Sequence, residues 1–74
     1  MAHIGNGPAR NIAVAGSVRH LVDEAASLGY DGIDFVPRGR EVRAISYNAK
    51  GQRAEAIGRN EVAAAQSLVR ALKR

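Results

Sequence analysis

The chain has 74 residues, with no cysteine or tryptophan, and its eleven Lys and Arg residues outnumber seven Asp and Glu residues. This length fits one domain and is too short for a nucleotide-binding α/β enzyme or a barrel, and the missing cysteines exclude disulfides and Cys-based metal or redox sites. No stretch approaches the roughly 20 apolar residues of a membrane span, and residues 1–10 lack the apolar core of a signal peptide, so we expect a cytoplasmic protein.

The N-terminal segment differs in composition from the rest. Residues 1–10 include Gly5, Gly7 and Pro8 and are predicted to form a flexible arm, whereas residues 11–74 are predicted to form a single α+β domain. Residues 11–16 fit a short strand or an early helical turn, because periodicity cannot decide over so few residues. Alanine is the commonest residue and aromatics are scarce, so we expect a thin core and modest stability unless a dimer or a partner adds to it.

The first clear helix is predicted to begin at Ser17, whose hydroxyl suits the N-cap position. Gly29 stands where a left-handed C-cap is expected. Between them, apolar residues recur at helical spacing and form one face. These residues are Val18, Leu21, Val22, Ala25 and Leu28.

Three strands are predicted next, over residues 32–36, 41–48 and 52–57. The connections between them, 37–39 and 49–51, are three residues long and end in Gly39 and Gly51. Such loops fit a type I turn followed by a left-handed glycine, with Pro37 and Asn48 at favourable turn positions. Two similar hairpins predict a three-stranded antiparallel meander.

These turns predict the strand register. Tyr47 should face Arg53 in the second hairpin, and Phe35 should face Glu41 in the first. We expect the sheet face with the bulky apolar residues to form the core, with charged residues at its margins, and the face with small residues to stay open. The expected core residues are Ile33, Phe35, Ile45, Tyr47 and Ile57, and the charged ones are Glu41, Arg43, Arg53 and Glu55. The expected open face holds Asp34, Val36, Val42, Ala44, Ser46, Ala54 and Ala56.

A second helix is predicted after Asn60, its N-cap, with Glu61 complementing the positive end of the helix. Its alanine-rich sequence would let it lie close against the sheet. The apolar positions that repeat at helical spacing are Val62, Ala65, Val69 and Leu72.

Charge is distributed unevenly along the chain. Residues 1–34 carry two arginines against four carboxylates, a net charge of −2, and residues 35–74 carry nine basic residues against three acidic ones, a net charge of +6. Nine of the eleven cations are Arg, which binds phosphates and carboxylates in a bidentate way. The expected partner is therefore nucleic acid or an acidic protein surface, although the same charge also serves solubility alone.

The sequence offers little for catalysis. His3 and His20 have no partner at metal-ligand spacing, and Asp23 and Glu24 are adjacent, so on a helix they point in different directions. We expect a protein that is not an enzyme, with no metal, no cofactor, no small-molecule substrate and no membrane contact.

Two candidate surfaces follow from the predicted fold. The candidate nucleic-acid-binding residues are cations at turn tips and at a helix start: Arg38, Arg40, Lys50, Arg53 and Arg59. The candidate interface for a protein partner or a second copy of the chain lies on the expected open face: Val36, Val42, Ala44, Ala54 and Ala56. A protein role would be that of a small inhibitor, an adaptor or a phage-type regulator.

The element order helix, three strands, helix resembles that of double-stranded RNA-binding domains over residues 17–73. The resemblance implies RNA binding through the first hairpin loop, here Val36-Pro37-Arg38-Gly39-Arg40 without a histidine, and through the start of the last helix, here Arg59-Asn60-Glu61-Val62 with one cation. The layout also resembles HicA-type mRNA-interferase toxins. Their catalytic histidine on the sheet has no counterpart here, so the resemblance does not imply nuclease activity.

Overall fold

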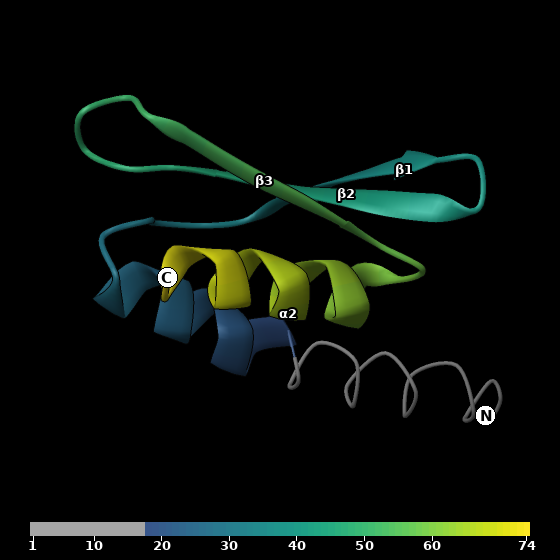
Figure 1. Cartoon of the computed structure of the whole chain (residues 1–74), viewed down its shortest axis with the longest axis horizontal. Coiled ribbons are helices and arrows are strands. Elements are labelled where there is room, and N and C mark those ends of the chain that lie inside the picture. The colour runs from purple at the N-terminus through teal and green to yellow at the C-terminus, as the bar shows by residue number, and fades with distance from the viewer. Residues whose placement is uncertain (1–17) are drawn as a thin grey trace, which may run out of the picture.

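The computed structural model of the chain describes residues 18–74. The first helix covers residues 18–27 of this part, and strands β1 (Asp34–Arg38), β2 (Glu41–Tyr47) and β3 (Arg53–Gly58) and helix α2 (Glu61–Leu72) follow. The strands form one antiparallel sheet in the order β1-β2-β3, and both helices lie on the same side of it (Figure 1). The α+β class and the order helix, three strands, helix are confirmed. The expectations for the arm, for residues 11–16, for His3 and for the Ser17 cap concern residues outside the described part.

The first helix ends in a Schellman motif, as Gly29 predicted. Gly29 has a φ of 95°, and its N–H donates to the carbonyl of Ala26 at 3.0 Å, while the N–H of Tyr30 donates to the carbonyl of Ala25 at 2.9 Å. These are the two bonds that satisfy the last carbonyls of a helix when the following residue is left-handed. Ala25 is fully buried at this end.

The second hairpin has the predicted register, with Tyr47 opposite Arg53 and Ile45 opposite Glu55. Its loop is closed by a 2.9 Å bond from the Gly51 N–H to the Asn48 carbonyl, and Gly51 has a φ of 80°. The Asn48 side-chain oxygen accepts from the N–H groups of Lys50 and Gln52 at 3.0 and 2.9 Å. The turn chemistry therefore fixes how β2 and β3 pair.

The predicted register of the first hairpin is wrong. Phe35 lies opposite Ala44 rather than Glu41, because β1 continues through Pro37 and Arg38 and the loop is only Gly39-Arg40. Gly39, with a φ of 61°, supplies the positive φ that two-residue hairpin loops require. Pro37 is tolerated in β1 because β1 is an edge strand.

The observed register differs from the predicted one by three residues. Because three is an odd number, the shift moves each β1 side chain to the opposite face of the sheet relative to β2. Phe35 therefore joins Ala44, Ala64 and Leu68 in the core, as its size predicted, but it does so beside the small residues of the sheet.

The prediction of which sheet face is covered is also wrong. Helix α2 packs on the small residues. The only polar residue among the described buried ones, Ser46, donates a hydrogen bond to the Gly32 carbonyl. Four residues expected in an open partner interface are thus covered: Val42, Ala44, Ala54 and Ala56. Three residues expected in the core lie instead on the sheet face that the helices do not cover: Ile45, Tyr47 and Ile57.

The physical reason for the covered face is the alanine content of α2. Asn60 caps α2 by accepting a 2.8 Å bond from the Ala63 N–H, as predicted. Ala64 is fully buried against Ala44 of the sheet, and Ala65 is fully buried as well. The helix approaches so closely that a Cβ built on Gly58 would lie 2.3 Å from the backbone nitrogen of Ala64. Small residues on both surfaces permit this distance, and larger side chains would hold the helix away.

The first helix and α2 are joined at their C-terminal ends by an ion pair between Glu24 and Lys73. The hydrogen bond from Lys73 is the largest effect on the pKa of Glu24 and lowers it, with the charges of Lys73 and His20 acting in the same direction against partial desolvation. A depressed carboxylate pKa stabilises the fold above the pKa of the unfolded chain, and this stabilisation is lost as the pH falls through the folded pKa.

We therefore expect Lys73→Gln to raise the pKa of Glu24 back toward its ordinary value, measured by NMR titration of its carboxyl carbon. Arg74→Gln, which removes the neighbouring cation, is the matched control and should leave the titration unchanged. Equal midpoints in the parent chain and Lys73→Gln would contradict the pairing.

Candidate functional site

One end of the sheet gathers three exposed arginines, Arg38, Arg40 and Arg59, which we call the arginine end. Arg38 and Arg40 flank the tip of the first hairpin, and Arg59 follows Gly58, which lies opposite Val42 at the start of β2. The β1–β2 turn and the connection from β3 to α2 accordingly lie on the same side of the molecule in Figure 1. Among the described residues, none of these three arginines forms an ion pair.

Helix α2 begins at this same end, directly after Arg59 and Asn60. Asn60 satisfies the Ala63 N–H, and the remaining first-turn N–H groups carry the positive end of the helix dipole. Glu41 and Glu61 are also here, so the five charged side chains give the end a net charge of +1. The arginine end thus combines three arginines with a helix start, and its net charge is small.

The other two cations expected to bind nucleic acid lie elsewhere. Lys50 is at the tip of the second hairpin and Arg53 begins β3, at the opposite end of the sheet (Figure 1). Arg53 is already engaged, since its guanidinium lies 2.8 Å from a carboxylate oxygen of Glu55. The structure thus brings together Arg38, Arg40 and Arg59 and separates them from Lys50 and Arg53.

The second surface is the sheet face opposite the helices, which we call the open sheet face. Its apolar members are exposed to an unusual degree for their size: 44% for Val36, 47% for Tyr47 and 49% for Ile57. Ile45 lies between them on β2 and is half-buried. Large apolar side chains gathered on one face indicate an interaction surface more than scattered ones do.

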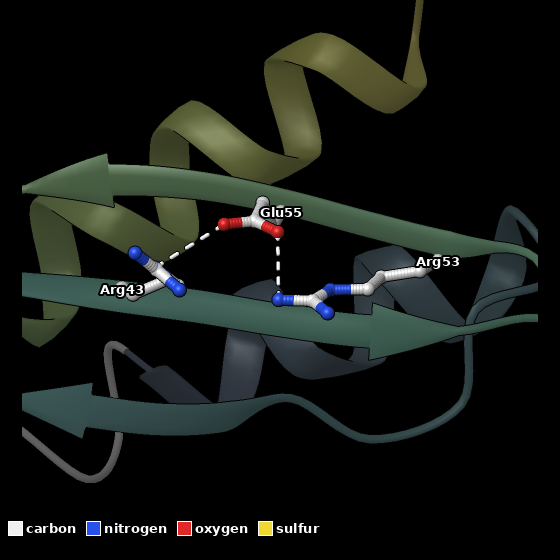
Figure 2. Close-up of polar contacts among 3 residues, drawn as sticks. All are labelled: Arg43, Arg53 and Glu55. Carbon is white, nitrogen blue, oxygen red and sulfur yellow. Dashed lines mark ion pairs between the residues drawn. The ribbon is translucent and has the colours of Figure 1, made fainter.

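An ionic network runs through this apolar face. Glu55 lies between two arginines, with one carboxylate oxygen 3.2 Å from Nε of Arg43 and the other 2.8 Å from a terminal nitrogen of Arg53. Figure 2 shows Glu55 reaching toward both. The Nε atom of Arg43 is buried and has no hydrogen bond of good geometry, so its contact with Glu55 is one of charge. The side chains of Arg43, Glu55 and Arg53 are 25%, 38% and 45% exposed, and ion pairs with this much solvent exposure contribute little to stability.

Sequence reasoning missed the open sheet face as a surface, although a signal was present. Four charged residues fell on the face that we expected to form the core, and they were assigned to its margins. Three of them, Arg43, Arg53 and Glu55, instead form the network among the apolar residues. Charged side chains that alternate with large apolar ones on one sheet face indicate an amphipathic surface that meets solvent or a partner.

A third feature is a groove of about 320 Å³ between the first helix and α2. Leu21 and Val69 line it together with Glu24 and Lys73, whose charges compensate one another. His20 is exposed on the first helix, and within residues 18–74 no three His, Cys, Asp or Glu side chains are grouped so that they could hold a metal ion.

The described helices include none that is both long enough and apolar enough to cross a bilayer. No protein-family model matches the chain, and no curated protein or solved structure matches it significantly.

Proposed function

We propose that this protein is a small non-enzymatic module that binds nucleic acid through its arginine end. The observation that carries the proposal is the position of Arg38, Arg40 and Arg59 on two connections that meet at one end of the sheet, beside the start of α2. Arginines and helix N-terminal N–H groups both bind phosphate oxygens. The resemblance to double-stranded RNA-binding domains supports duplex RNA as the first ligand to try, and the cytoplasm is the compartment that this role implies.

Nucleic-acid binding by the arginine end predicts how steeply the binding constant falls with salt concentration. Three arginine–phosphate contacts give a slope of log K against log[salt] near −3, since each neutralised phosphate of a duplex contributes about −0.9. Replacing Arg38, Arg40 and Arg59 together by Ala should remove most of this slope and weaken binding at low salt at least about tenfold. Fluorescence anisotropy with labelled duplex RNA, duplex DNA and single strands measures both quantities.

The matched control removes the same charge from the opposite end of the molecule, by Lys50→Ala, Arg70→Ala and Arg74→Ala in one chain. If the arginine end is the site, this control keeps more affinity than the arginine-end variant. An equal loss in both variants would mean diffuse attraction to a basic protein, and no binding at low salt in the parent chain would remove the proposal.

A second role, as a protein-interaction module, is favoured by a different observation. The open sheet face exposes Val36, Tyr47 and Ile57, and its charges nearly cancel, which suits a protein surface better than a polyanion. The two surfaces meet at Arg38 and Glu41, whereas Tyr47 and Ile57 belong to the open sheet face alone.

A further inference from the structure

We propose that the open sheet face is the contact surface of a homodimer, in which two copies stack face to face with their strands antiparallel. The proposal rests on the second proposed role and not on nucleic-acid binding. Six charged residues on this face are balanced, three of each sign: Arg38, Arg43, Arg53, Asp34, Glu41 and Glu55. A face without net charge does not attract a polyanion, so the occupant we infer is a protein.

The strand register arranges the centre of this face in two neighbouring rows that cross all three strands. One row has a net charge of +1 and the next has a net charge of −2. The positive row holds Val36, Arg43 and Ile57, and the negative row holds Asp34, Ile45 and Glu55.

These rows make the face complementary to itself. Consider a twofold axis in the plane between the two sheets, perpendicular to the strands and midway between the two rows. Rotation about this axis places the positive row of each copy over the negative row of the other. Arg43 of one copy then faces Asp34 and Glu55 of its partner, and Ile45 meets the aliphatic part of that arginine. A surface that complements itself is what an isologous dimer needs, and a second copy is the partner that supplies it.

The other way of stacking two copies is electrostatically unfavourable. A twofold axis parallel to the strands would place Arg43 over Arg43 of the partner, and Asp34 over Glu55. Like charges in direct apposition suppress an association. The charge rows therefore select the antiparallel arrangement.

The contact is expected to be weak. Three strands about 4.8 Å apart and about seven residues long cover only about 14 by 23 Å, less than half of the about 800 Å² per partner in a standard interface. Burial of the exposed Val36, Tyr47 and Ile57 supplies a gain. Val36 and Ile57 lie over Asp34 and Glu55 of the partner in this stack, and desolvation of these carboxylates offsets part of that gain. We expect a dissociation constant in the micromolar range or above, so the dimer forms at high protein concentration.

Sedimentation equilibrium of the full chain over a concentration series up to about 1 mM tests the dimer. Ile57→Asp puts a negative charge in one of the two central rows, over Glu55 of the partner, and should raise the dissociation constant at least about tenfold. Leu28→Asp changes an equally apolar residue, 40% exposed but outside the sheet, and should have no effect. A parent chain that is monomeric throughout, or a dimer that Ile57→Asp leaves intact, overturns the proposal.

A charge exchange tests the arrangement itself. Arg43→Glu and Glu55→Arg each create repulsion across the axis in their own homodimers, whereas in a mixed dimer position 43 of each copy faces an opposite charge at position 55 of the other. Each variant carries its own internal repulsion in the monomer as well as in the dimer, so this repulsion cancels from the dissociation constants. A mixed dimer tighter than both homodimers supports the antiparallel stack, and equal affinities overturn it.

The effects of Ile57→Asp on dimerisation and on RNA binding distinguish the dimer proposal from the proposal of nucleic-acid binding. Ile57→Asp should weaken the dimer at least about tenfold and keep the affinity for duplex RNA, because the arginine end is untouched. If added RNA instead perturbs the NMR signals of Ile57 and Tyr47 in a monomeric chain, the face belongs to nucleic acid and the dimer is overturned.

Discussion

Gly58→Ala is expected to destabilise the fold by about 3 kcal/mol, at the upper end of the range for overpacking. The new Cβ would lie 2.3 Å from the Ala64 nitrogen, 2.6 Å from the Ala63 carbonyl carbon and 2.7 Å from the Ala64 Cα. All three atoms are backbone, so no side chain can rotate away, and β3 and α2 must separate. Urea unfolding followed by circular dichroism measures the loss.

The matched control for Gly58→Ala is Gly51→Ala. Its Cβ would meet no atom within 4 Å, but Gly51 has a φ of 80°, so the substitution carries only the strain of a left-handed conformation, about 1–2 kcal/mol. The structure predicts that Gly58→Ala is the more damaging change although its backbone is unstrained. The opposite order would contradict the close contact between β3 and α2.

The parts of the fold that the sequence predicted are those controlled by local backbone chemistry. Gly29 ended the first helix, Asn60 began α2, and Asn48 with Gly51 set the β2–β3 register, each through hydrogen bonds that span only a few residues. Such motifs depend on φ and on a nearby side-chain acceptor, both of which a short sequence specifies.

The first hairpin could not be predicted in the same way because Pro37 is ambiguous. Proline favours the start of a turn, and it is also tolerated in an edge strand. Which of these applies depends on which strand lies at the edge, and that is a property of the whole sheet. In this protein Pro37 lies within the edge strand β1, and this register places Phe35 beside Ala44 in the core.

The covered face was mispredicted for a related reason. The expectation that the largest apolar residues lie inside is only a tendency, and here the close approach of α2 selects alanines for the core. The arginine end depends on the same tertiary arrangement. Arg38 and Arg59 are far apart in the sequence, and only the pairing of Val42 with Gly58 brings their segments to one end.

Leu68→Ala is the second change with a large expected effect, about 2–5 kcal/mol. Leu68 is fully buried, and it is the largest side chain among the described residues that are completely covered. It packs with Ala44 and Ala64, and the partly buried Phe35 lies against this cluster. The neighbouring alanines, Ala44 and Ala64, have side chains too short to fill the space, so a cavity remains and its cost adds to the lost burial.

Two controls separate the cavity from other effects of the Leu68 substitution. Leu68→Met keeps the volume and should cost less than about 1.5 kcal/mol, and Leu28→Ala removes the same atoms from a residue that is 40% exposed, with an expected cost below about 1 kcal/mol. A domain of this size holds only about 5 kcal/mol or little more, so Leu68→Ala could leave much of the chain unfolded at 25 °C, visible as lost ellipticity before any urea is added. If Leu68→Ala and Leu28→Ala unfold at the same urea concentration, then Leu68 does not centre the core and α2 does not pack on the alanine face of the sheet.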